Sequence, residues 1–187
     1  MRFARCVTCA GLTIALLGCA PAVDVTEHNK QVVMEVVEAM NAFRYDDLDN
    51  LIAQTYHRHC QATPDVQVET LDQFKAMMKG FEGAFDDGRV EIFELIAEGD
   101  LVAMTGTYRG THTGRMGPFA ATGKTVDSEF AGYHRFKDGK IVETWVTWDN
   151  VAMMQQLGLF PPAQPESEAD AIEVEALPTK RTDSVLL

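Results

Sequence analysis

The spacing of the apolar residues changes once along the chain, and this change determines the fold class that the chain can adopt. Up to about residue 85 the apolar residues recur three and four positions apart, as on one face of a helix. After the Asp-Asp-Gly turn at 86–88 the spacing falls to about two, which is typical of strands. Helices followed by about four strands predict an α+β domain with one antiparallel sheet.

Three segments of the first half are predicted to be helices. The first runs from about 26 to 44, behind a capping-box spacing of Asp24 and Glu27. The third begins at Thr70, in a Thr-x-x-Gln capping box. The second is expected to present Leu48, Leu51, Ile52 and Tyr56 on one face.

The strands of the second half are predicted to meet at short turns. The turns are at 98–100 and at Asp138-Gly139, and a Gly-rich loop separates the two hairpins. Counting outward from the second turn places Phe130, Trp145 and Asp149 on one surface of the sheet. Both surfaces carry large apolar groups, so both need cover. Helices can cover one, and a second copy of the chain is expected to cover the other, which makes a homodimer.

The N-terminal residues 1–19 are predicted to be a signal peptide. Two arginines precede a short apolar run, which has fewer than the about 20 residues needed to span a bilayer. The run ends in Leu-Leu-Gly-Cys, which resembles the bacterial lipoprotein signal with Cys19 as the lipidated residue. We expect a lipid-anchored protein of the cell envelope, at the periplasmic face of the outer membrane. The alternative is ordinary cleavage near Ala20 or Ala22 and secretion.

The remaining chain divides into a short linker at 20–25, one domain at 26–160 and a disordered acidic tail at 161–187. The tail has clustered prolines and acids and no aromatic residues. A net charge of −12 argues against nucleic acid as a partner, and leaves the lipid as the only expected contact with a membrane. Removal of the signal peptide and lipidation of Cys19 leave Cys60 alone, expected to be half-buried and unable to form an internal disulfide.

Asp149 is the first candidate for a catalytic group. It ends the last predicted strand, on the side of Trp145 and Phe130. A carboxylate among aromatic rings is poorly solvated and exchanges a proton near neutral pH, as general acid–base catalysis requires. The alternative is that Asp149 caps a helical turn that begins at Val151.

The histidines are weaker candidates. His59 follows Tyr56 at helical spacing. It is expected either to line a pocket or to have a structural role. His112 enters the Gly-rich loop and would line a site or hold the loop by a hydrogen bond. His134 is expected to be structural or solvent-facing. No metal is expected, because the spacing of His57, His59 and Cys60 fits no closed zinc site.

Six segments, in order through most of 26–160, together resemble the SnoaL-like polyketide cyclases. These proteins, also called ester cyclases, belong to the superfamily of nuclear transport factor 2. The segments are "YHRH" (56–59), "IAEGDLVA" (96–103), "YRGTHTG" (108–114), "ATGKTV" (121–126), "HRFKDGKIVETWVTWD" (134–149) and "QQLG" (155–158).

The resemblance implies a cone-shaped fold, in which a strongly curved sheet and three N-terminal helices enclose a deep apolar pocket. The cyclases close a ring by intramolecular aldol condensation of a polyketide ester, without metal or cofactor. An Asp matching Asp149 removes a proton next to a carbonyl, and positions matching His59 and His112 often carry histidine. The chain departs from the pattern at Thr147, where some cyclases have histidine.

The expected function is therefore that of an ester cyclase acting on a small apolar carbonyl compound without a cofactor. Asp149 would be its acid/base. The alternative is a non-catalytic, lipid-anchored periplasmic module that binds a small molecule, since the scaffold also serves binding proteins. The predicted pocket residues are Tyr56, His59, His112, Phe130 and Trp145.

Overall fold

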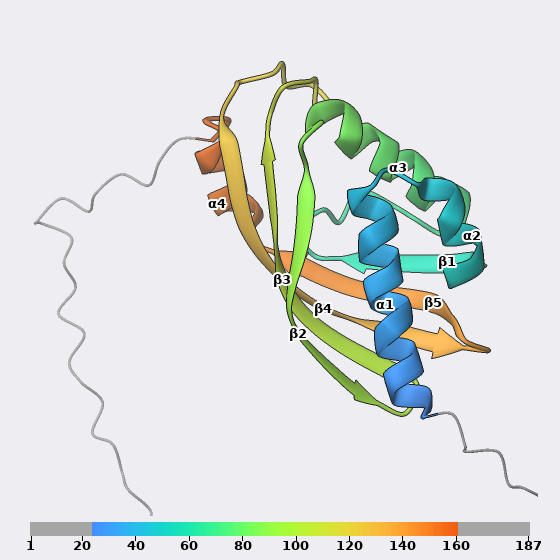
Figure 1. Ribbon diagram of the computed structural model, residues 1–187. Helices are drawn as coiled ribbons and strands as arrows, with labels where there is room; N and C mark the ends of the chain where they lie inside the picture. Colours follow the sequence, from blue (N-terminus) through green and yellow to red (C-terminus); the bar gives the residue numbers. More distant parts are fainter. Residues whose placement is uncertain (1–23, 161–187) are drawn as a thin grey trace, which may run out of the picture.

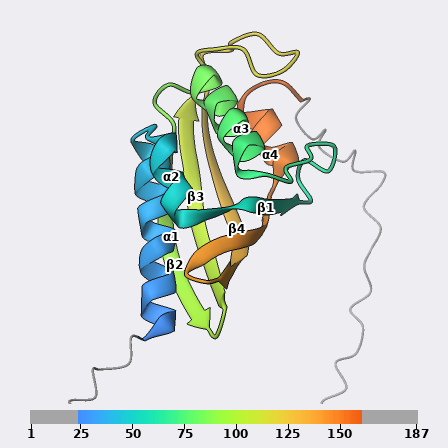
Figure 2. The same cartoon turned by 90° about the vertical axis from the view of Figure 1, so that its right-hand side faces the viewer.

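The computed structural model of the protein describes residues 24–160, and its centre is a curved five-stranded sheet with helices packed against one side (Figures 1 and 2). The predictions for the signal peptide, Cys19 and the acidic tail lie outside these residues. The helical elements are α1 (Val25–Asn41), a single turn η1 (Tyr45–Asp47), α2 (Leu48–Leu51), α3 (Leu71–Ala84) and α4 (Asn150–Gln156). The strands are β1 (Ile52–Cys60), β2 (Arg89–Glu98), β3 (Leu101–Thr111), β4 (Thr125–Lys137) and β5 (Lys140–Trp148).

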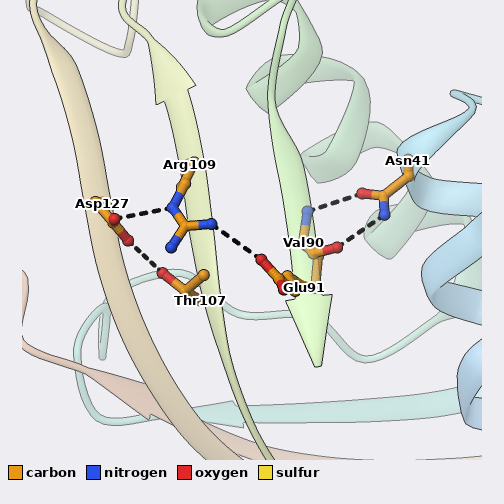
Figure 3. Close-up of polar contacts among 6 residues, drawn as sticks. All are labelled: Asn41, Val90, Glu91, Thr107, Arg109 and Asp127. Atoms are coloured by element: carbon orange, nitrogen blue, oxygen red, sulfur yellow. Dashed lines mark hydrogen bonds and ion pairs between the residues drawn. The ribbon is translucent and has the colours of Figure 1, made fainter. Parts of the chain in front are cut away.

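Helix α1 is fixed at both ends by side-chain hydrogen bonds. At its start, the Thr26 N–H donates to the carboxylate of Asp24 at 3.0 Å, which satisfies one free donor of the first turn. At its end, Asn41 donates to the Val90 carbonyl and accepts from the Val90 N–H, both at 2.8 Å (Figure 3). The second pair of bonds attaches α1 to the outermost strand, β2. No helix within 24–160 is long and apolar enough to cross a bilayer.

The predicted second helix is wrong, because it ends after the four residues of α2 and continues as strand β1. Ile52 and Tyr56 are buried as predicted, but they belong to a strand. A spacing of four is an even number, so it puts two residues on the same side of a strand as well as of a helix. The pairing of β1 with β5, far along the chain, decides between the two.

The sheet has the order β1-β5-β4-β3-β2, and it is mixed, whereas an antiparallel sheet was expected. Strands β2 to β5 form the expected antiparallel hairpins, with the turns at Gly99 and at Asp138-Gly139 in left-handed conformations. Strand β1 adds to β5 in parallel. In Figures 1 and 2, β1 is strongly inclined to β2 and β3 at the other edge of the sheet, so the sheet is strongly curved.

A β-bulge in the last hairpin changes which side chains share a face. Lys137 pairs with Lys140 as predicted, but Val142 is an extra residue on β5, and every later pair is displaced by one. Tyr133, instead of Gly132, lies opposite Trp145. A one-residue shift moves each following side chain to the other face of the strand.

The face of the sheet away from the helices is partly apolar. The rings of Tyr133, Trp145 and His59 are stacked in a row, with centroids 4.6 and 4.5 Å apart. Along β3 and β4, Arg109 forms an ion pair with Asp127 at 2.8 Å, which Figure 3 shows. The homodimer expected to cover this face stays a prediction.

Candidate functional site

An apolar cavity of about 190 Å³ lies between the sheet and the helices. This is more than ten times the roughly 10–15 Å³ that one water molecule occupies by the same measure. Its wall comes from all five strands and from α1, α3 and α4. Five methionines contribute to it, namely Met40, Met77, Met78, Met104 and Met153. Because thioether side chains are flexible and polarisable, such a wall adapts to apolar molecules of different shapes.

A row of polar side chains crosses the sheet inside this cavity. Arg58 of β1 is in register with Thr144 of β5, and Thr144 is in register with His134 of β4. All three line the cavity, as does Tyr56, two residues before Arg58 on the same side of its strand. The sequence order gives little hint of this row, because its members come from strands that are far apart in the chain.

His134 is held neutral inside the cavity wall. Its Nδ1 lies 2.8 Å from the hydroxyl oxygen of Thr144, which fixes the orientation of the ring. Burial lowers the pKa of His134 to about 4, because the charged imidazolium would lose its solvation. At neutral pH the ring is therefore uncharged, with one nitrogen engaged by Thr144.

Tyr56 remains protonated over the whole physiological range. Burial raises the pKa of Tyr56 to about 12, while the Thr144 hydroxyl and the charge of Arg58 act in the opposite direction. Its ring packs against Phe74 at a centroid distance of 5.2 Å. The phenol is thus a potential hydrogen-bond donor beside Thr144.

Arg58 and Trp148, which both line the cavity, each have a buried N–H donor. The guanidinium carbon of Arg58 lies 5.6 Å from the centroid of the Trp148 ring. Arg58 Nη1 and Trp148 Nε1 are buried, and neither has a hydrogen-bond partner among residues 24–160. Buried donors are nearly always paired in folded proteins, so these two groups need an explanation.

Asp149 lies outside the set of residues that line the cavity. It is exposed, and it is the N-cap of α4, where its Oδ1 accepts a hydrogen bond from the Ala152 N–H at 2.8 Å. The capping interpretation of Asp149 is therefore confirmed. Its catalytic role stays a prediction.

Substitution of Asp149 is expected to affect stability through this cap. Asp149→Ala should lower the free energy of unfolding by about 1 kcal/mol, because the Ala152 N–H loses its acceptor. Asp149→Asn should change the free energy of unfolding by only a few tenths of a kcal/mol, since Asn caps helices about as well as Asp. Urea denaturation of both variants measures the difference, and equal losses would argue against the cap.

Only two of the five predicted pocket residues line the cavity. Tyr56 and Phe130 do so. Trp145 lies on the opposite face of the sheet because of the bulge, and His59 is stacked against it there. His112 is fully buried outside the cavity. Its Nδ1 lies 3.2 Å from the Thr122 hydroxyl oxygen, and its ring stacks on Phe85. These contacts fit the alternative that His112 stabilises the loop.

Among the cavity residues not predicted from the sequence are Arg58, His134, Thr144 and Trp148, which carry the polar groups discussed above. Arg58 could have been found from its spacing of two from Tyr56, once that segment is recognised as a strand. The other three lie on the hairpin strands, and the bulge, which has no marker in the sequence, determines which of them share a face.

Solved structures of other proteins share the overall fold of this chain. IdmH, a putative polyketide cyclase from Streptomyces antibioticus, is 27% identical, with 70% of this chain and 98% of that chain covered and a TM-score of 0.62. AclR, a putative hydroxylase from Streptomyces galilaeus, is 26% identical, with 74% and 90% covered and a TM-score of 0.65.

A putative SnoaL-like polyketide cyclase from Jannaschia sp. shares the fold at 18% identity, with a TM-score of 0.67 over 76% of this chain and 99% of that one. No curated protein matches the sequence. The family model "SnoaL-like polyketide cyclase" matches residues 30–157. The chain therefore belongs to the SnoaL-like polyketide cyclase family.

Proposed function

We propose that the protein binds a small, largely apolar carbonyl compound in the cavity and transfers a proton at the carbon next to the carbonyl. The observation that carries this proposal is the neutral His134, oriented by Thr144 inside an apolar wall. Membership of the polyketide cyclase family supports ring closure as the outcome. Under this proposal the function needs no cofactor.

In the proposed mechanism, the imidazole of His134 takes the proton from the carbon, and the electron pair moves to the carbonyl oxygen to form an enolate. The enolate carbon attacks a second carbonyl of the same molecule, which forms the new carbon–carbon bond. The resulting alkoxide receives the proton back from the imidazolium. The negative charge of the enolate favours the imidazolium, so the weak basicity of His134 in the empty cavity is offset during the reaction.

Tyr56 is the proposed donor to the enolate oxygen. It lines the cavity, and its phenol stays protonated at neutral pH because burial raises its pKa to about 12. Fixed donors in a site that excludes water stabilise a developing negative charge without having to reorganise.

The test compares His134 with Asp149, because sequence analysis predicted the latter as the acid/base. The assay follows deuterium uptake next to the carbonyl of 2-tetralone, an apolar ketone, by NMR in heavy water. His134→Gln should lower kcat/KM by roughly 10²–10⁴-fold, the usual contribution of a general base. Asp149→Asn should keep kcat/KM within about twofold of the wild-type value. The matched control His57→Gln, at an exposed strand position, should do the same.

The opposite pattern, with loss in Asp149→Asn and none in His134→Gln, would make Asp149 the base and overturn the role of His134. If the wild-type protein does not exceed the buffer rate, the catalytic proposal fails.

A wild-type rate no higher than the buffer rate would favour the alternative, a module that binds a small molecule without catalysis. The specific observation in its favour is that the exposed Asp149 already serves as a helix cap. The catalytic and the binding-only proposals both include lipid attachment through Cys19 and a location in the cell envelope. Only the sequence of residues 1–19 supports these two features.

A further inference from the structure

We infer that the natural ligand of the cavity carries a carboxylate, which binds to Arg58 and Trp148, so that the substrate is an apolar acid and not an ester. This inference rests on the proposed function of the same cavity. It specifies the substrate class by its charge.

The cavity wall carries a single positive charge. Among the described residues, Arg58 is the only lysine or arginine of the wall, and no aspartate or glutamate belongs to it. His134 is neutral there. The contact of Arg58 with the Trp148 ring leaves its charge without a counter-ion. A partly buried cation without a counter-ion is costly, by several kcal/mol for a fully buried ion. A ligand with one negative charge would neutralise the wall.

Arg58 differs from three other arginines of the described chain. Arg44, Arg109 and Arg135 each form an ion pair with a carboxylate at 2.8 Å. Arg58 forms no hydrogen bond through its side chain and no ion pair within residues 24–160. The chain has 28 acidic residues against 16 basic ones, so carboxylates are abundant, yet none of those within residues 24–160 forms an ion pair with Arg58.

Two unpaired donors lie in this part of the wall. Arg58 Nη1 and Trp148 Nε1 belong to neighbouring side chains, and each is a buried N–H without an acceptor. A carboxylate has two oxygens with about four acceptor sites, and its charge strengthens each hydrogen bond. An ester carbonyl accepts hydrogen bonds but leaves the charge of Arg58 uncompensated.

The position of Trp148 also separates the acid group from the reacting carbon. Trp148 is four residues beyond Thr144 on β5, a distance of about 13 Å at roughly 3.3 Å per residue. Thr144 holds His134. Arg58 starts in register with Thr144, and its guanidinium reaches the Trp148 ring. The carboxylate would therefore lie towards Trp148, and the reactive carbonyl towards His134.

The test uses two fluorescent probes with nearly the same apolar body. One is 1-anilinonaphthalene-8-sulfonate, which is an anion, and the other is N-phenyl-1-naphthylamine, which is neutral. The wild-type protein should bind the anion at least tenfold more tightly. Arg58→Met should lose at least tenfold in affinity for the anion and less than twofold for the neutral probe. Arg58→Lys should keep most of the preference.

The matched control is Arg109→Met, at an ion-paired strand arginine on the outer face, which should bind both probes as the wild type does. Circular dichroism checks the fold of each variant. If Arg58→Met does not fold, Arg58→Gln replaces it, with the same expected loss. Competition then tests the carboxylate: decanoate should displace the anionic probe at lower concentration than 1-decanol.

The outcomes separate the two proposals. Equal binding of both probes by the wild type, or an unchanged preference in Arg58→Met, overturns the inference about charge and leaves the apolar cavity as a binding site. Equal displacement by decanoate and decanol also overturns it. Binding of neither probe contradicts the proposed function itself.

Discussion

Replacement of Phe85 by alanine is expected to lower the free energy of unfolding by about 3–5 kcal/mol, as for other fully buried phenylalanines. Phe85 has no exposed surface, and it directly follows α3. Its ring contacts Tyr108 at 5.8 Å and His112 at 5.3 Å between centroids. Gly110 leaves room for it, since a Cβ there would lie 3.2 Å from the Phe85 side chain.

Phe85 thus joins α3 to β3 and to the loop that begins at His112, and alanine would leave a hole that these elements cannot close. Urea denaturation measures the loss, which is large compared with the roughly 5–15 kcal/mol that stabilises a typical domain. The matched control is Phe93→Ala, whose side chain is 51% exposed and which should cost about 0.5 kcal/mol or less. Similar losses in the two variants would contradict this account of the packing.

Acid is expected to destabilise the protein through His134. Burial holds the pKa of this residue at about 4 in the folded state, compared with 6.5 for an ordinary histidine. Between these values the unfolded chain binds a proton that the folded chain does not. The stabilisation is therefore complete above pH 6.5 and is lost as the pH falls towards 4, by about 3 kcal/mol in total.

The measurement compares the wild-type protein with His134→Gln by urea denaturation at pH 7 and pH 4.5. Exposed carboxylates titrate in both proteins, so their effect cancels in the difference. The wild type should lose about 2–3 kcal/mol more than the variant over this interval. Parallel pH dependences would show that His134 is not held in the neutral form.

The outline of the fold could be predicted from the sequence because it depends on local patterns. The change of apolar period marks the α+β division, and the Asp24 and Thr70 caps and the Asp138-Gly139 turn act over a few residues. The prediction of the second helix was wrong because the spacing between Ile52 and Tyr56 fits a helix and a strand equally well. Only the pairing of β1 with β5, a contact between distant segments, makes that segment a strand.

The candidate site was less predictable because it depends on register. One extra residue at Val142 puts Trp145 outside and leaves Trp148 and His134 inside the cavity. Both faces of this hairpin are rich in apolar residues, so the sequence pattern does not show which face is buried. The role of Asp149 as a cap, in contrast, could be anticipated from local order alone, as an acid directly before a helical segment.

The thioether wall of the cavity makes the site sensitive to oxidants. The sequence has nine methionines, and five of those within residues 24–160 line the cavity. An oxidising agent small enough to enter would convert them to sulfoxides, which are polar and chiral. Oxidation would weaken binding of the apolar part of a ligand and leave the charge of Arg58 unchanged. In an oxidising compartment, the useful lifetime of the protein would then depend on sulfoxide repair or on the ligand itself shielding the sulfur atoms.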